Sequence, residues 1–203
     1  NRKSVRQYSD KKVEQEKIDM ILKCAMAAPS GMNKQPWEFL VVTDKGKLEK
    51  IAEIAPNASY SKNSQVAIIV CGDKNISEKF WEQDCCAVTE NILLAVEALE
   101  LGAVWCMVYP SDERIDGIKS LFNLPDNIIP LNIIPIGYPL TNEEPKQKYN
   151  PKKIKDVCFL VTIDKERQAE LAKVLNKRRA WFGQVIPEYV ETGLYPGNAR
   201  QNR

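Results

Sequence analysis

The sequence contains no histidine, and this absence removes several kinds of active site at once. Hydrolase triads that use an imidazole as general base are excluded, and so are zinc sites built on histidine and cysteine spacing. A metal site would need an unusual set of ligands, and a hydrolase would need a catalytic base other than histidine. We therefore expect no metal site in this protein.

An excess of charge of one sign is also missing. The 203 residues include 29 Lys or Arg and 27 Asp or Glu, which gives a net charge of +2, and 44% of the residues are hydrophobic. This composition is typical of an ordinary globular protein with one domain and room for an appendage. Because no global field would attract nucleic acid or an anionic membrane, any basic site must be local.

A long uninterrupted apolar run is lacking as well. The longest one, from Ile92 to Tyr109, contains Glu97 and Glu100, and the first residues do not combine a charged segment with an apolar one. We therefore expect neither a membrane span nor a signal peptide, and we expect the protein in the cytoplasm.

A disulfide framework is not expected, although the chain has cysteines. They stand at positions 24, 71, 85, 86, 106 and 158, and each lies within apolar sequence rather than in a loop. This placement favours reduced thiols in the core over disulfides.

Apolar periodicity predicts helices that alternate with short buried strands. Helices are expected over Val13–Ala27, Lys45–Ile54, Asp84–Leu101, Ser111–Phe122 and Glu166–Ala180, and strands over Trp37–Thr43, Val66–Cys71, Ala103–Val108, Pro130–Gly137 and Val157–Ile163. The Asp84–Leu101 segment is apolar around most of its circumference, so it must be buried on nearly all sides, with Gly102 as its C-cap. The order of elements indicates a mixed α/β or α+β layer fold.

Cations and a hydroxyl stand close together in the opening stretch "RKSVRQY". Arg2, Lys3, Ser4 and Arg6 combine guanidinium and ammonium groups with a hydroxyl donor, and such groups bind phosphate. The same cluster is also typical of a solvated arm, or of a nucleic-acid-binding arm whose affinity falls steeply with salt. A second basic stretch, residues 146–155, has five lysines and is by itself typical of a solvated, flexible segment.

The stretch "AAPSGMNKQPW", Ala27 to Trp37, follows a predicted helix and leads into a predicted strand. Its Pro, Ser, Gly and Asn residues suit an ordinary helix stop and loop. Asn33 and Gln35 also provide amide donors and acceptors that suit the polar edge of a planar heterocycle, and Trp37 would anchor the strand in the core.

Several of these motifs, taken in order, resemble the FMN-dependent nitroreductases. The resemblance rests on "RKSVRQY", "AAPSGMNKQPW", "DCCAVTENILLAVEALELGA", "IPIGYP" and the late basic "NPKK", and it extends over Asn1 to Phe159. It implies an α+β fold with a central, mostly antiparallel sheet flanked by helices, and a long buried central helix at a homodimer interface. It also implies two FMN molecules, each held by residues of both chains.

The resemblance assigns the cofactor-binding residues one by one. The phosphate and ribityl chain would be bound by Arg2, Lys3, Ser4 and Arg6, with Gly137 nearby and Lys152 or Lys153 on the same phosphate. Pro29, Ser30, Gly31 and Asn33 would lie against the isoalloxazine from the partner subunit. Asn57 would face the pyrimidine edge, and backbone groups from Val108 and Tyr109 to Pro110 would approach flavin N5.

The implied activity is reduction of a nitroaromatic, quinone or similar small molecule with NADH or NADPH, in a ping-pong cycle through flavin N5. No catalytic side chain is assigned, because the cofactor carries the hydride. The alternatives are a flavin-dependent dehydrogenase or dehalogenase of the same fold, or a non-catalytic flavin-binding protein. The short segment from Gly72 to Asp84 leaves little room for the substrate lid of the deiodinase branch.

The resemblance also divides the chain. Residues 1–160 are expected to form the FMN-binding domain, and residues 161–203 a C-terminal extension whose role the sequence does not indicate. Neither nucleic acid nor membrane is expected as a partner.

Overall fold

The computed structural model describes residues 2–141 and 144–154. The chain divides into two units, Asn1–Lys148 and Tyr149–Arg203, and each is considered by itself. The described part of the second unit contains the short 3-10 helix η3 (Pro151–Lys153), where the Asn150 side chain accepts a hydrogen bond from the Lys152 N–H. The strand and helix predicted over 157–163 and 166–180 lie outside the described residues.

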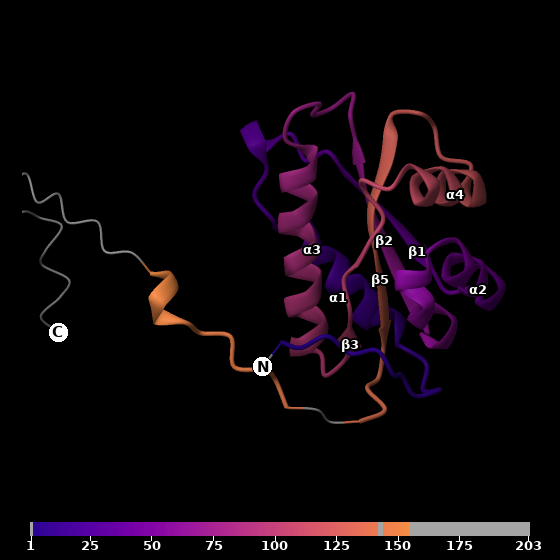
Figure 1. The fold of residues 1–203 in the computed structure, drawn as a ribbon, viewed down its shortest axis with the longest axis vertical. Helices are drawn as coiled ribbons and strands as arrows, with labels where there is room; N and C mark the ends of the chain where they lie inside the picture. Colours follow the sequence, from indigo (N-terminus) through magenta and orange to yellow (C-terminus); the bar gives the residue numbers. More distant parts are fainter. Residues whose placement is uncertain (1, 142–143, 155–203) are drawn as a thin grey trace, which may run out of the picture. The chain divides into compact units, whose positions relative to one another are not determined.

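An antiparallel sheet forms the centre of the first unit (Figure 1). Its strands are β1 (Trp37–Val42), β2 (Val66–Asp73), β3 (Gly102–Ala103), β4 (Cys106–Met107) and β5 (Ile128–Gly137). The order is β1-β2-β5-β3, with β4 also paired to β5, and each of these pairings is antiparallel. The predicted α+β class with a mostly antiparallel sheet is confirmed.

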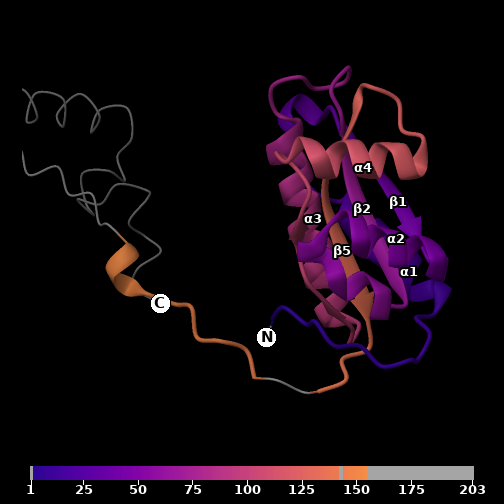
Figure 2. The same cartoon turned by 45° about the vertical axis from the view of Figure 1, so that its right-hand side comes forward.

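Helices cover both faces of the sheet, as Figures 1 and 2 show. One face carries α1 (Gln15–Met26) and α3 (Trp81–Ala98), and the other carries α2 (Lys45–Ile54), the 3-10 helix η2 (Pro56–Asn63) and α4 (Asp112–Phe122). Alternate residues of β2 supply the two cores, because successive side chains of a strand point to opposite faces. Ile68 and Val70 pack on the α3 side, and Ala67 and Ile69 on the other.

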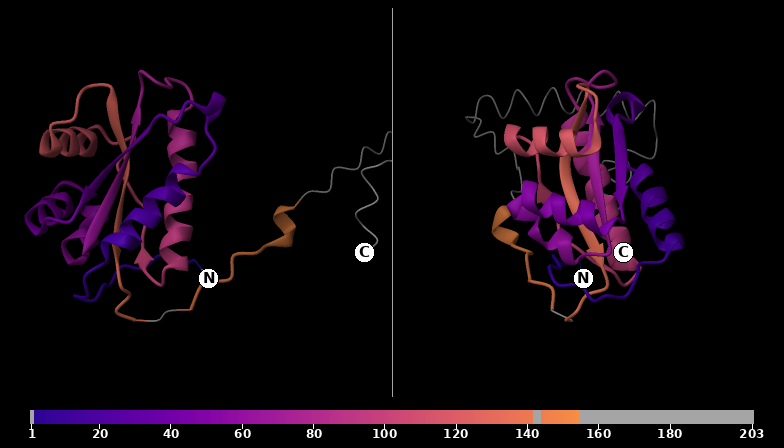
Figure 3. Two further views of the ribbon diagram at one scale, coloured as in Figure 1. Left: turned by 180° about the vertical axis from the view of Figure 1, so that it is seen from behind. Right: turned by 90° about the vertical axis from the view of Figure 1, so that its right-hand side faces the viewer.

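Helix α3 is the long apolar helix that the sequence predicts. It packs against α1 and β2, and half of its 18 residues are buried. The left view of Figure 3 shows this layer from behind. Within the described first unit, one stripe of α3 stays uncovered, where Leu94 is 50% exposed and Gln83, Glu90 and Ala98 are also exposed. Burial on nearly all sides is therefore not reached within a single chain.

The predicted C-cap role of Gly102 is wrong. Glu100 adopts the left-handed conformation (φ 60°) after the helix, and the Leu101 N–H donates to the Val96 carbonyl at 2.9 Å. Gly102 instead belongs to β3, and it is small because Val5 packs directly on it.

The strand predicted over 103–108 appears as two short pieces, β3 and β4, although both keep one register on β5. Ala103 pairs with Ile136, and Cys106 pairs with Ile133. The same register places Val104 opposite Pro135, which has no N–H to donate to the ladder. The sequence prediction missed this interruption because it depends on which residue of the neighbouring strand lies opposite.

Among the described residues, helices are either too short or too polar to span a bilayer.

A glycine substitution tests how tightly the first residues pack on the sheet. A Cβ at Gly102 would lie 2.6 Å from the Val5 Cβ, so Gly102→Ala should lower the free energy of unfolding by about 1–3 kcal/mol. Urea unfolding measures this change. Gly46→Ala on α2 is the matched control, because its Cβ would meet only the Asp44 carboxylate at 3.4 Å. Equal stability of both variants would contradict this packing.

Candidate functional site

The N-terminal arm, residues 2–9, is fixed along the end strand of the sheet. Ser4 forms a parallel bridge with Ala103, and the Val5 N–H donates to the Ala103 carbonyl at 2.9 Å. At the other end of the arm, the Ser9 N–H donates to the Tyr138 carbonyl at 2.9 Å. The arm is therefore part of the fold, and the interpretation as a solvated arm does not hold.

Tyr8 anchors the arm to β5. Its buried hydroxyl lies 2.7 Å from the Val5 carbonyl and 3.1 Å from the Pro135 carbonyl. Burial raises the pKa of the Tyr8 phenol above its usual value, so the group stays a neutral donor. A Cβ at Gly137 would come within 3.0 Å of the Tyr8 side chain, which explains the glycine by packing alone. A place for Gly137 beside a phosphate stays a prediction.

The cations of the arm are held loosely enough to bind an anion. The Arg2 Nε lies 3.8 Å from the Glu90 Oε1, and the two side chains are 23% and 51% exposed. A long, partly exposed ion pair of this kind contributes little to stability. Lys3 and Ser4 are partly buried and Arg6 is exposed. Arg2, Lys3, Ser4 and Arg6 thus combine a fixed backbone with accessible donors.

The structure brings the arm to two further predicted regions. The Arg6 guanidinium lies 5.7 Å from the ring centroid of Tyr60 on η2, the helix that also carries Asn57. The Asn57 side-chain amide donates to the Met107 carbonyl at 2.9 Å, and Arg114 donates to the same oxygen at 3.0 Å. Arg6, Asn57 and the residues that follow β4 therefore lie along one stretch of surface.

A β-bulge positions the segment after β4. The pairing of β2 with β5 skips Leu131, and its carbonyl accepts the N–H groups of both Val108 and Tyr109 at 3.0 Å. The Ser111 N–H donates to the Val108 carbonyl. Because these N–H groups bond within the chain, Tyr109 can offer a ligand its carbonyl or its ring, which lies edge-on to Trp81. Contact of Val108 and Tyr109 with a flavin stays a prediction.

The loop of residues 29–35 has a backbone conformation that residues other than glycine rarely adopt. Met32, Asn33 and Gln35 have φ angles of 54°, 55° and 50°, in the left-handed region. The backbone N–H of Gln35 donates to the Ser30 Oγ at 3.0 Å, and the side-chain Nε2 of Gln35 donates to the Asn33 Oδ1 at 2.8 Å. Since the Asn33 oxygen is used inside the loop, its NH₂ group is the part that can face a ligand.

The 29–35 loop and the N-terminal arm lie at opposite ends of α3 (Figure 1). The Gly31 N–H donates to the Asp84 Oδ1 in the first turn of α3 at 2.9 Å, whereas Ser4 pairs with Ala103 after the last turn. A helix of 18 residues is about 27 Å long. Within one chain, the structure does not bring Pro29, Ser30, Gly31 or Asn33 to the arm.

The late lysines belong to the other unit of the chain. Lys152 and Lys153 are exposed on η3, and their predicted contact with the phosphate stays a prediction.

The cysteines of the described residues are free thiols, as their positions in the sequence indicate. Burial raises the pKa of Cys71 to about 12 and that of Cys106 to about 11. At neutral pH these side chains are protonated, so they are poor nucleophiles. Cys158 lies outside the described residues.

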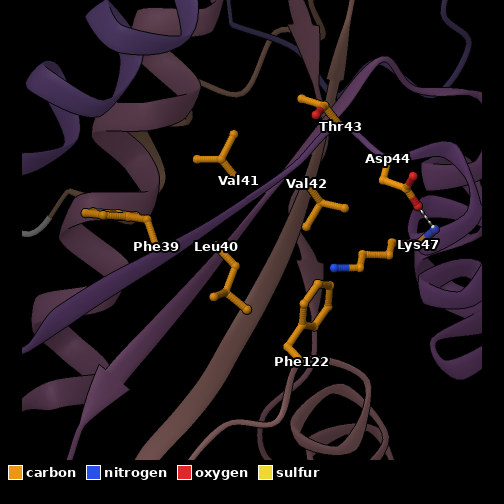
Figure 4. A pocket seen from close by; sticks show the side chains of 8 residues that line it. All are labelled: Phe39, Leu40, Val41, Val42, Thr43, Asp44, Lys47 and Phe122. Atoms are coloured by element: carbon orange, nitrogen blue, oxygen red, sulfur yellow. Dashed lines mark hydrogen bonds between the residues drawn. The ribbon is translucent and has the colours of Figure 1, made fainter.

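A shallow pocket of about 340 Å³ lies elsewhere, over the edge strand β1 (Figure 4). Its lining is mostly apolar, and its charged side chains are Asp44 and Lys47, which belong to the start of α2. It contains none of the predicted site residues. A single lysine beside an acid also does not suit a phosphate dianion.

Sequence reasoning missed several residues that shape these regions. Tyr8, Tyr60 and Arg114 act through contacts that only the fold reveals. Asp84 carried little signal, because an acid in the first turn of a helix is ordinary, and only the structure shows that this one is buried, with 6% of it exposed. Such an acid needs a partner, and here the partner is the Gly31 N–H.

Comparison with known proteins places these features in a family. A model described as "Nitroreductase family" matches residues 1–65. A protein of Methanothermobacter thermautotrophicus, provisionally named NADH dehydrogenase/NAD(P)H nitroreductase, is 44% identical over 155 residues, which cover 75% of this chain and 81% of the relative.

Two solved structures share the fold. One, from Parabacteroides distasonis and with the same provisional name, is 48% identical with a TM-score of 0.76, and the match covers 78% of this chain and 95% of that one. The other, an FMN-dependent nitroreductase of Clostridium difficile, is 30% identical with a TM-score of 0.74, and covers 78% and 96% of the two chains. Identity of this extent over most of both proteins has one reading: the chain belongs to the nitroreductase family.

Proposed function

We propose that the protein is an FMN-dependent NAD(P)H oxidoreductase that reduces nitroaromatic, quinone or similar small molecules. The family and the names of its relatives support this class of enzyme. The observation that carries the proposal is the N-terminal arm, which is built into the sheet and presents two arginines, a lysine and a serine hydroxyl.

The residues present fit FMN. Arg2 and Arg6 offer planar guanidinium forks and Ser4 offers a hydroxyl, and groups of these kinds bind a phosphate dianion. Arg6 lies beside Tyr60 of η2. The same helix carries Asn57, which bonds to the Met107 carbonyl at the end of β4. This surface can therefore hold the phosphate at the arm and the ring system toward Asn57.

In this proposal the chain's own residues bind and orient the cofactor and the substrate. No side chain is assigned a chemical step. Bound FMN would supply the redox chemistry, since flavin N5 accepts a hydride from a nicotinamide. The bonds from Val108 and Tyr109 to Leu131 fix the shape of the segment expected to face the ring. The raised pKa values of Cys71 and Cys106 argue against a thiolate in the reaction.

The site is proposed to be shared between two chains. Pro29, Ser30, Gly31 and Asn33 lie a helix length away from the arm of their own chain, which suits a loop that serves a partner's cofactor. The uncovered stripe of α3 offers a second copy a surface to cover, in which Leu94 and Ala98 lie among the polar Gln83 and Glu90. Lys152 and Lys153 remain candidates for the same phosphate.

The absorption spectrum of the purified protein is the first test. A colourless protein that takes up no added FMN would contradict the proposal. Oxidation of NADH or NADPH with several acceptors then separates a reductase from a flavin-binding protein without activity. Turnover confined to halogenated phenols would favour the dehalogenase alternative.

Arginine substitutions test the phosphate site. Arg2→Ala or Arg6→Ala should each weaken FMN binding by about 10- to 150-fold, because a charge-assisted hydrogen bond to phosphate contributes roughly 1.5–3 kcal/mol. Quenching of flavin fluorescence on titration measures the dissociation constant. Lys50→Ala, on the exposed side of α2, is the control and should bind FMN normally. Unchanged affinity in both arginine variants would place the phosphate elsewhere.

Subunit mixing tests the shared site. Two inactive variants, one at Arg2 and one at Asn33, should regain activity when mixed, because the heterodimer contains one site with both residues intact. Native mass spectrometry verifies that the subunits exchange. Verified exchange without any return of activity would show that each site is built within one chain.

Steady-state kinetics test the order of binding. If NAD(P)H and the acceptor bind one after the other at the same site, double-reciprocal plots should be parallel. The range of acceptors should be broad, because a pocket that admits both molecules fits neither of them closely. Cys71→Ser and Cys106→Ser should keep the rate of flavin reduction, apart from folding losses. Intersecting lines, or a folded and FMN-loaded Cys variant that is not reduced by NAD(P)H, would rule out this mechanism.

A further inference from the structure

We propose that Asp84 is a positioning residue, which holds the 29–35 loop in the shape needed to face the flavin. The inference rests on the proposed function, because that function assigns the loop to the cofactor of a partner subunit. Asp84 itself touches neither cofactor nor substrate in this scheme. It acts through the backbone of Gly31.

The contact is direct and buried. The Asp84 Oδ1 accepts the Gly31 N–H at 2.9 Å, and Asp84 is 6% exposed. Its other oxygen, Oδ2, is buried without a hydrogen-bond partner among the described residues. A buried carboxylate oxygen left without a hydrogen-bond partner costs stability. The first turn of α3 offsets part of this cost, because a helix N-terminus favours negative charge.

The loop needs such a tether because its own conformation is unfavourable. Met32, Asn33 and Gln35 are all left-handed, and each left-handed residue that is not glycine adds strain. The bonds among Ser30, Asn33 and Gln35 keep the loop's internal shape but do not attach it to the fold. The bond from the Gly31 N–H to the Asp84 carboxyl group joins the loop to α3.

Gly31 also sits close to a neighbouring side chain. A Cβ there would lie 3.4 Å from the Phe80 ring, an ordinary van der Waals distance, so the loop lies beside Phe80 without crowding. The bond to Asp84 is the contact that fixes the Gly31 backbone. The amide of Asn33, two residues later, then has a defined position toward a ligand.

The test compares three variants with the wild type. Asp84→Ala removes the acceptor, Asp84→Asn keeps an oxygen for Gly31 and places an NH₂ where Oδ2 stands, and Asp84→Ser is too short to reach. The control is Thr89→Val on the same helix. Thr89 is buried and bonds Asn132 and the Cys85 carbonyl, away from the loop. It reports the effect of losing a buried polar group from α3.

Two readouts are measured, the FMN dissociation constant and the hydrogen exchange of the Gly31 amide. Asp84→Ala and Asp84→Ser should raise the dissociation constant about tenfold or more and speed Gly31 exchange, while Asp84→Asn should stay within about threefold of wild type. Thr89→Val should lower stability and change neither readout. If Asp84→Ala does not fold, the Asn and Ser variants decide.

The outcomes separate the inference from the proposed function. Wild-type protein that binds no FMN would overturn the proposed function, and with it the role of the loop at a flavin. Wild-type FMN binding together with unchanged affinity and unchanged Gly31 exchange in the Asp84 variants would overturn the inference alone. A loss of FMN affinity in Thr89→Val as large as in Asp84→Ala would show that Asp84 acts only through the stability of α3.

Discussion

The attachment of the N-terminal arm to the sheet depends on the lack of side chains at two glycines. Gly102 leaves room for Val5, and Gly137 leaves room for Tyr8, so the arm can lie directly on the end of the sheet. The bonds from Val5 to Ala103 and from Tyr8 to the Pro135 carbonyl then fix its backbone. Without this close approach, the cations would sit on a mobile chain, and ordering them would cost binding free energy.

Helix α3 sets the distance between the two halves of the proposed site. Its C-terminal end leads into the strand that carries the arm, and its N-terminal end carries Asp84, which holds Gly31. A rigid helix of this length keeps the two regions apart within one chain, so they can meet only across an interface. The same helix offers a surface for the proposed interface, since Leu94 is exposed in a single copy.

Small irregularities in β5 shape the surface between these ends. Pro135 interrupts the ladder beside Val104, and its carbonyl is close to the Tyr8 hydroxyl. The bulge at Leu131 provides one carbonyl for the N–H groups of Val108 and Tyr109. In both cases, a carbonyl group that would bond to the neighbouring strand in a regular ladder accepts a different hydrogen bond. They connect the edge of the sheet to the residues expected to surround the cofactor.

The sequence by itself determined the fold class, the family and most elements, because apolar periodicity and ordered local motifs survive in any context. The helices over 45–54 and around 84–101, and the strands around 37–43 and 66–71, follow from such patterns. Only the tertiary structure decided the role of Gly102, the break opposite Pro135 and the pairing of Asp84 with Gly31. These features depend on residues far apart in the chain, and local pattern carries no information about which distant group will lie opposite.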